Sequence, residues 1–176
     1  QLSQYMPESQ ALSLMGLDIS KWAVQSAAKQ DDKRAPVSRW VVGSNAQLPV
    51  QSATLNSVLC MFGFPVYSEF ARVLKPGGQL LQVEAGSEHL RELREIIYPT
   101  LKPAREKAPD VPEGFAHRAS EQISYAISLE GADVIHDLLT MTPHLYRASA
   151  EGRERAANLE QLTLTIDAQL IVWERI

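Results

Sequence analysis

The chain of 176 residues lacks several features that mark specialised classes of protein. It has a single cysteine, Cys60, which excludes an internal disulfide and any metal site built from cysteines alone. Its longest apolar stretches, such as 57–65, fall far short of the roughly 20 residues that a membrane helix needs. The first ten residues lack the basic cluster and apolar run of a signal peptide. These absences predict a cytoplasmic protein with no membrane segment and no metal site.

A strong charge of one sign is also missing, since 17 Lys and Arg face 21 Asp and Glu, for a net charge of −4. This value argues against a nucleic-acid footprint over the whole surface, but it allows a local basic patch. Lys102, Arg105 and Lys107 form a small basic group that Glu106 dilutes, so a solvated surface is the first interpretation and an RNA contact the second. The chain begins with Gln1, and we expect it to start after processing or inside a longer gene product.

What the sequence does have is an alternation of strand-like and helix-like segments, which predicts an α/β fold. We expect strands at 14–19, 40–43, 55–62, 79–84, 123–129 and 162–173. We expect helices at 21–29, 68–74, 87–98 and 132–141. The sequence Lys-Pro-Gly-Gly at 75–78 predicts a helix stop and a turn into the next strand. A charged stretch broken by prolines follows at 99–114.

Polar residues follow two of the predicted strands. Asp18, with Ile19 and Ser20 after it, stands where α/β folds bind a ribose through a strand-end acid, although such an acid also helps to cap the next helix. Ser44 and Asn45 follow the next strand, where short polar side chains bind the adenine edge in nucleoside sites. The alternative for this second pair is a simple polar turn.

The order of these features resembles the class I S-adenosylmethionine-dependent methyltransferases. More narrowly, the chain is similar to the bacterial large-subunit ribosomal RNA (guanine-N1)-methyltransferases. The narrower resemblance is carried by GLDISKWAVQSAAK at 16–29, ARVLKPGG at 71–78, HLRELREIIY at 89–98, EGF at 113–115 and LLTMTPHLYRAS at 138–149. It implies a Rossmann-like mixed sheet with helices on both faces, S-adenosyl-L-methionine as cofactor and 23S ribosomal RNA as partner. It also implies one catalytic domain over 1–176, with a substrate-side insertion at 99–149.

The resemblance assigns roles to two groups of residues. Four residues at the two strand ends would bind the cofactor: Asp18, Ile19, Ser44 and Asn45. Three residues of the 138–149 segment would bind a flipped base or its RNA: His144, Tyr146 and Arg147. By its position at the end of a predicted strand, Glu84 is the best carboxylate to remove the proton of guanine N1, and its alternative is a solvated strand end.

Two features of the resembling family have no counterpart in this chain: an N-terminal zinc ribbon, and a first strand that ends in an acidic, glycine-rich loop. In the class I fold that strand lies between the strands expected at 14–19 and 55–62, so we expect two unpaired edges there. Upstream residues, another chain or a rearranged sheet would have to fill the gap. Segment 60–66 also departs from the family pattern, which leaves a small-molecule methyltransferase as an alternative. A second alternative is that the fragment is non-catalytic.

Overall fold

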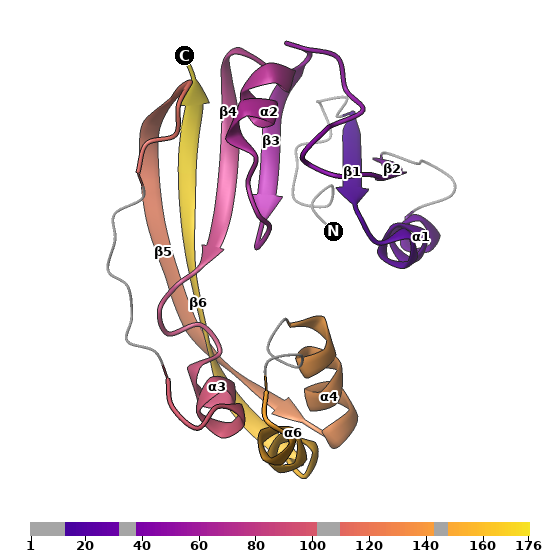
Figure 1. The fold of residues 1–176 in the computed structure, drawn as a ribbon, viewed down its shortest axis with the longest axis vertical. Helices are drawn as coiled ribbons and strands as arrows, with labels where there is room; N and C mark the ends of the chain where they lie inside the picture. The colour runs from indigo at the N-terminus through magenta and orange to yellow at the C-terminus, as the bar shows by residue number, and fades with distance from the viewer. Residues whose placement is uncertain (1–12, 32–37, 102–109, 143–147) are drawn as a thin grey trace.

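The computed structural model describes residues 13–31, 38–101, 110–142 and 148–176 (Figure 1). A two-stranded sheet pairs β1 (Leu14–Asp18) with β2 (Ser38–Val42). A four-stranded sheet has the order β3-β4-β6-β5, formed by β3 (Leu55–Met61), β4 (Leu74–Ala85), β5 (Phe115–Glu130) and β6 (Gln161–Arg175). The helices are α1 (Lys21–Gln30), α2 (Tyr67–Val73), α3 (Arg91–Ile97), α4 (Ala132–Met141) and α6 (Ala150–Ala157). None of the helices in the described ranges is long and apolar enough to cross a membrane.

The β1–α1–β2 unit is a parallel strand–helix–strand arrangement. Ser20 begins α1, because its hydroxyl accepts a hydrogen bond from the Ala23 N–H at 3.3 Å. Gly16 lies so close to the Trp40 ring that a Cβ there would overlap it. Of the side chains whose burial the structure describes in these three elements, only that of Val24 is buried. The unit therefore has almost no core of its own.

The four-stranded sheet is mixed: β3 and β4 are parallel, while β6 runs antiparallel to both β4 and β5. Because side chains alternate between the faces of a strand, β6 contributes to two cores. Ile171 and Trp173 pack with Phe70 of α2 on one face. Leu162 and Leu164 pack against α3, α4 and α6 on the other. The predicted Rossmann-like mixed sheet with helices on both faces is confirmed.

Several predicted boundaries are wrong. The helix expected at 87–98 begins only at Arg91, because the preceding turn is hydrogen-bonded to β6. The stop expected at 75–78 lies inside β4, where the pairing with β3 shifts register. β5 begins at Phe115 instead of residue 123, since its exposed first half is mostly polar and lacks the apolar alternation that marks a strand. Helix α6 was not predicted, and it begins at Ser149, whose hydroxyl accepts from the Gly152 N–H at 3.0 Å.

A seam separates the two sheets (Figure 1). Within the described residues, β1 pairs only with β2, and β3 pairs only with β4. The facing edges of β1 and β3 are therefore unpaired, and the two strands are not bonded to each other. This confirms the expectation that the strand at 14–18 does not pair directly with the one at 55–61.

Candidate active site at the carboxyl edge of the sheets

The carboxyl ends of β1 and β2 lie at one edge, because the two strands are parallel. The Gly43 N–H donates to the Asp18 carbonyl at 3.0 Å, which brings the loop of Ser44 and Asn45 beside the end of β1. Ile19, next to Asp18, is exposed. The four residues that the sequence assigns to the cofactor thus come together at this edge. Their role in binding stays a prediction.

Two of these polar side chains also stabilise their own turns. Asp18 Oδ1 accepts from the Ser20 N–H at 2.7 Å, and Ser44 Oγ accepts from the Ala46 N–H at 3.1 Å. These contacts match the structural alternative for each residue. They do not use up the acceptors, since a carboxylate has about four lone-pair positions and a hydroxyl has two. Exposed Asp18 can therefore hold its turn and still accept hydrogen bonds from a ribose.

Asn45 links the cofactor edge to the segment that follows β3. Its side-chain amide donates to the carbonyl oxygen of Phe64, a residue whose own ring is 90% exposed. The segment at 60–66 is the one in which the sequence departs from the resembling family. The two halves of the candidate site are therefore joined through the seam by a side-chain contact.

Glu84 lies near the carboxyl end of β4 at the end of a buried polar chain. The Gln82 amide oxygen, itself buried, accepts from Tyr67 Oη at 3.1 Å and from Trp173 Nε1 at 2.9 Å. These two donors fix the amide so that its NH₂ group donates to Glu84 Oε1 at 2.5 Å. Glu84 is half-buried and oriented, which differs from the solvated strand end that was its alternative. Its catalytic role stays a prediction.

The surroundings of Glu84 keep two nearby groups protonated. Burial raises the pKa of the Cys60 thiol, and the Glu84 carboxylate raises it further. Burial likewise raises the pKa of the Tyr67 hydroxyl, with Glu84 again adding to the effect. Cys60 is therefore a buried thiol packed in the core beside α2, with no character of a nucleophile.

An aromatic pair lies at the same end of the sheet. The Phe62 and His89 rings are stacked, with centroids 5.4 Å apart and planes at 26°. Behind them Asp167, 1% exposed, accepts from Gln122 Nε2 at 2.8 Å and from the Glu88 N–H at 2.9 Å. The Asp167 N–H donates to His89 Nδ1 at 3.3 Å. The imidazole is therefore held from behind by β6.

Sequence reasoning missed this polar network, although two of its members carried a signal. Gln82 and Asp167 are polar residues at buried positions of β4 and β6, where the other buried side chains are apolar. A buried polar residue has to find a partner, so such positions mark a network. Phe62 and His89 carried no comparable signal, because their pairing depends on where two separate chain segments meet.

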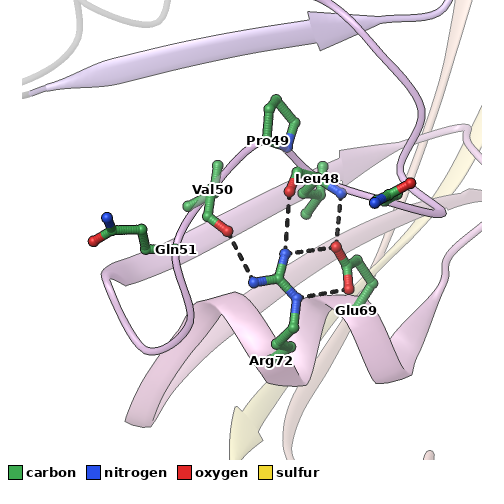
Figure 2. A pocket seen from close by; sticks show the side chains of 7 residues that line it. Leu48, Pro49, Val50, Gln51, Glu69 and Arg72 are labelled. Carbon is green, nitrogen blue, oxygen red and sulfur yellow. Dashed lines mark hydrogen bonds and ion pairs between the residues drawn. The ribbon is translucent and has the colours of Figure 1, made fainter.

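The hollow beside the 47–51 loop is closed by Arg72 (Figure 2). The guanidinium donates to the carbonyl oxygens of Leu48 and Val50 at 3.1 and 2.8 Å. It also donates to both carboxylate oxygens of Glu69 at 2.6 and 2.8 Å, and to Ser52 Oγ at 3.2 Å. All five N–H groups of the arginine are thus engaged. Its hydrogen bonds lower the pKa of Glu69 to about 2.

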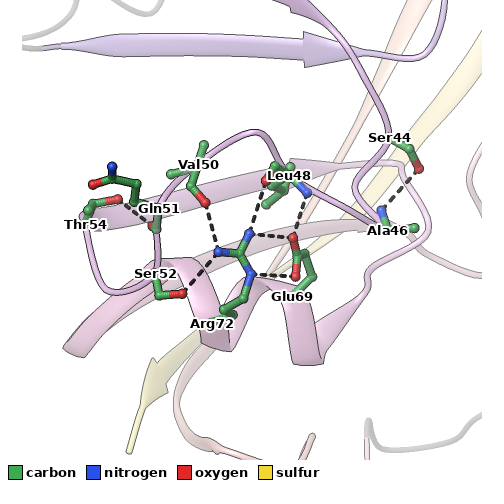
Figure 3. Close-up of polar contacts among 9 residues, drawn as sticks. All are labelled: Ser44, Ala46, Leu48, Val50, Gln51, Ser52, Thr54, Glu69 and Arg72. Carbon is green, nitrogen blue, oxygen red and sulfur yellow. Dashed lines mark hydrogen bonds and ion pairs between the residues drawn. The ribbon is translucent and has the colours of Figure 1, made fainter.

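This Arg72–Glu69 contact is a structural lock. Figure 3 shows it beside the turn made by Ser44 and Ala46. Because Glu69 also accepts a hydrogen bond from the Leu48 N–H, the loop that leads away from the cofactor edge is held against α2. A ligand in this hollow would have to compete with hydrogen bonds that the protein already makes. We therefore assign the hollow to the scaffold of the site.

The predicted substrate residues His144, Tyr146 and Arg147 lie outside the described residues. Met141, at the end of α4 just before them, is 84% exposed. The substrate-side role of 99–149 stays a prediction, while the structure places β5, within this range, in the sheet. In the part of the chain that the structure describes, no three His, Cys, Asp or Glu side chains gather into a group that could hold a metal ion.

Within the described residues, the strand orders β2-β1 and β3-β4-β6-β5 on the two sides of the seam are those of the class I methyltransferases on either side of their central first strand. Residues 1–82 match the family model described as "Methyltransferase domain". The fold of the chain is thus that of a class I methyltransferase. A domain of this class implies S-adenosyl-L-methionine as its cofactor.

One curated relative is the Bacillus subtilis (strain 168) protein named "Putative 23S rRNA (guanine-N(1)-)-methyltransferase YxjB". It is 29% identical over 162 residues, which cover 89% of this chain and 55% of the relative. The chain thus spans about half the length of that relative.

Solved structures share the fold. A protein from the study of the conversion of a disulfide bond into a thioacetal group during echinomycin biosynthesis has a TM-score of 0.61 at 13% identity, covering 93% of this chain and 67% of that one. The [4+2]-cyclase SpnF has a TM-score of 0.57 at 14% identity, covering 99% and 70%. The YcgJ protein from Bacillus subtilis has a TM-score of 0.50 at 20% identity, covering 92% and 81%. A cyclase among them illustrates that this fold alone does not fix the reaction.

Proposed function

We propose that the protein is an S-adenosylmethionine-dependent methyltransferase that methylates N1 of a guanine in 23S ribosomal RNA. The observation that supports the proposal is the Asn45–Phe64 hydrogen bond, which joins the strand-end loop of the predicted cofactor residues to the segment after β3. Phe62 of that segment is in turn hydrogen-bonded to Val83, the residue before Glu84. The guanine-N1 target is supported by the name of the Bacillus subtilis relative.

The residues at the cofactor edge fit the two ends of a nucleoside. Asp18 offers a carboxylate to the ribose hydroxyls, and the Ser44–Asn45 loop offers short polar groups to the adenine edge. When bound, S-adenosylmethionine would supply an electrophilic methyl group on a sulfonium, with the thioether of S-adenosylhomocysteine as the leaving group. Guanine N1 carries a proton near neutral pH, and Glu84 accepts that proton as the new bond forms.

The Gln82 amide gives Glu84 the orientation that this role needs. Because Tyr67 and Trp173 occupy the amide oxygen, the NH₂ group can only point toward the carboxylate. The carboxylate is thus held in one geometry before the substrate arrives, which reduces the reorganisation that the reaction requires. We expect Glu84→Gln to lower kcat by about 10²- to 10⁴-fold while cofactor affinity stays the same.

The first experiment is calorimetry with S-adenosylhomocysteine on the full-length protein. Asp18→Ala should weaken binding by about 1–3 kcal/mol, because the ribose hydroxyls lose their charged acceptor. Asp133→Ala is a matched control, since Asp133 is an exposed aspartate at the start of α4, on a different element. An unchanged affinity in the Asp18 variant would contradict the assignment. A wild type that binds no cofactor would favour a non-catalytic role.

The second experiment tests the substrate. Methylation of a 23S ribosomal RNA hairpin is compared with methylation of a panel of small aromatic metabolites. Small molecules are the second candidate, because exposed Phe62 and Phe64 occupy a segment where the resembling family carries basic residues. Tyr146→Ala and Arg147→Ala should lower RNA methylation and leave cofactor affinity intact. Equal loss of cofactor binding in both variants would instead place this segment in the cofactor pocket or the core.

A further inference from the structure

The exposed face of the Phe62 ring is the feature of the carboxyl edge that the proposed chemistry leaves unused. Phe62 follows β3 directly and is 55% exposed, although its ring stacks on His89. Its N–H donates to the Val83 carbonyl at 2.8 Å, so its backbone is fixed beside the residue that precedes Glu84. A large aromatic side chain is thus held beside the strand end that carries Glu84.

A dense set of hydrogen bonds holds the turn that carries His89. The Gly86 N–H donates to the Asp167 carbonyl at 2.9 Å, and the Leu90 N–H donates to the Thr165 carbonyl at 2.8 Å. A Cβ at Gly86 would overlap the Asp167 carboxylate, so the turn approaches β6 more closely than any other residue type would allow. The imidazole therefore sits on a rigid support.

Backbone strain marks both sides of the pair. Among the described residues other than glycine, positive φ angles occur only at Ala53, Phe62 and Leu90, with values of 54°, 50° and 51°. Phe62 is one ring of the pair, and Leu90 follows the other. Bulky residues adopt this conformation at an energetic cost, and they keep it where the surrounding structure enforces it. Strain of this kind concentrates at binding sites.

The imidazole presents a neutral ring to Phe62. Its Nδ1 accepts the Asp167 N–H, so in the neutral form the ring proton is on Nε2. Burial lowers the pKa of His89, which favours that neutral form. A neutral ring behind Phe62 supports an aromatic surface suited to a flat, uncharged partner.

We propose that Phe62 is a stacking residue for the guanine base that accepts the methyl group, and that His89 is the positioning residue that holds the Phe62 ring. This inference rests on the proposed function and deepens it. A base stacked on Phe62 would present its edge toward Glu84, two residues along β4 from the Gln82 amide. Guanine carries two adjacent donors on that edge, N1–H and the 2-amino group, which match a carboxylate. The stack and the carboxylate together thus select guanine over the other bases.

The test compares Phe62→Leu with Phe62→Tyr in the full-length protein. Stacking of one base on an aromatic side chain corresponds to about 5- to 100-fold in affinity, so Phe62→Leu should raise the KM for the RNA hairpin by that factor. Phe62→Tyr keeps the ring and should retain the wild-type KM. Tyr125→Leu is the matched control, since Tyr125 is equally exposed on β5 at 54% and should not change KM.

Two variants test separately the aromatic ring of His89 and its hydrogen-bond acceptor. His89→Phe keeps a ring behind Phe62, whereas His89→Asn keeps a hydrogen-bond acceptor and loses the ring. If His89 positions Phe62 by stacking, His89→Phe should keep KM near the wild-type value, and His89→Asn should raise it as Phe62→Leu does. The affinity for S-adenosylhomocysteine should be equal in all these variants.

The outcomes separate the two proposals. Cofactor binding and RNA methylation with an unchanged KM in Phe62→Leu would overturn the stacking role and leave the proposed function standing. A wild type that binds S-adenosylhomocysteine but methylates only small molecules would overturn both the RNA target and the stacking of guanine on Phe62. Recovery of a normal KM in His89→Asn would show that His89 acts through its hydrogen bond to Asp167 instead of through its ring.

Discussion

The β1–α1–β2 unit buries far less of itself than the four-stranded sheet does. In the unit, Val24 is the one buried side chain among those described, whereas exposed apolar residues include Trp22 at 70% and Ile19 at 79%. In the sheet, Trp173 and Leu164 are at most 1% exposed and belong to two separate cores. A two-stranded sheet is marginally stable at best in water. The half that carries the predicted cofactor residues is therefore the weaker half.

The β1–α1–β2 unit is less buried than the four-stranded sheet because the two sheets do not pair with each other at the seam. Both edges along the seam are unpaired within the described residues, so β1 gains hydrogen bonds from β2 only. The two regions are held together instead by loop contacts, such as the Asn45 amide on the Phe64 carbonyl and the Arg72 lock on the 47–52 loop. In the class I fold a strand occupies this seam. A single strand parallel to both edges would give the weaker half the core that it lacks.

The largest expected effect contrasts two tryptophans of the two regions. Trp173→Ala should destabilise the full-length protein by about 3–5 kcal/mol, because it empties a core position and removes a donor to Gln82. Trp22→Ala should lower the free energy of unfolding by less than about 1 kcal/mol, since that ring is exposed. The interaction it would lose is with the Lys21 ammonium, 4.9 Å from the ring centroid. Denaturant unfolding measures both. Equal losses would mean that the β1–α1–β2 unit is as firmly packed as the sheet.

Binding of S-adenosylhomocysteine should narrow the difference in local stability between the β1–α1–β2 unit and the four-stranded sheet. Amides of β1 and β2 should exchange with solvent at a lower free energy of opening than those of β4 and β6. S-adenosylhomocysteine at 100 times its Kd should protect the β1–β2 amides by up to about 2.7 kcal/mol. Hydrogen exchange with and without the ligand measures this. Protection confined to β4 and β6 would contradict a cofactor site at Asp18 and Ser44.

The next largest expected effect comes from breaking the buried hydrogen bonds of Gln82 in the four-stranded sheet, compared with the turn hydrogen bond of Ser44 that follows β2. Gln82→Leu leaves Tyr67 Oη and Trp173 Nε1 without their acceptor, so it should cost about 1–3 kcal/mol and lower kcat by freeing Glu84. Ser44→Ala removes one exposed turn bond and should cost about 0.5–1 kcal/mol. Unfolding and kinetics on the same variants separate the two effects. A Gln82→Leu variant with normal kcat would show that Glu84 does not depend on this chain for its orientation.

The elements that sequence reasoning placed well are those fixed by local signals. The strand ending at Asp18 and the helix capped by Ser20 depend on apolar spacing and a side-chain cap within a few residues. Helix α4 has the predicted bounds, because its apolar periodicity is unbroken. Helix α3 begins late for the opposite reason: the turn before it bonds to β6, which lies more than 70 residues away in the sequence.

The site shows the same division. The strand-end positions of Asp18 and Ser44 followed from the order of elements along the chain, whereas the Gln82 chain did not. Gln82 and Trp173 are 91 residues apart, and His89 and Asp167 are 78 apart. Their contacts depend on the β4–β6 register, which no local pattern specifies. The sequence therefore predicted which strand ends carry the candidate residues, whereas the residues that orient Glu84 and Phe62 could be found only in the structure.

The smallest expected effect is the pH dependence of the turn that carries His89. Burial lowers the pKa of His89 below its ordinary value of 6.5, so the folded protein favours the neutral ring. The unfolded chain then binds more protons in the window below pH 6.5, and the turn should lose stability as the pH falls through it.

The Asp167 carboxylate adds a second, more acidic window. The hydrogen bond from Gln122 lowers the pKa of Asp167 below its ordinary value of 3.8. Its contribution is therefore present above that value and is lost as the pH falls through the lowered pKa. Thermal unfolding from pH 7 down to about pH 2 should show the first loss below pH 6.5 and the second below pH 3.8. His89→Asn should abolish the first loss and keep the second, whereas Gln122→Ala should weaken the second alone. Stability that rises as the pH falls from 6.5 would contradict the neutral, half-buried His89 on which the support of the Phe62 ring depends.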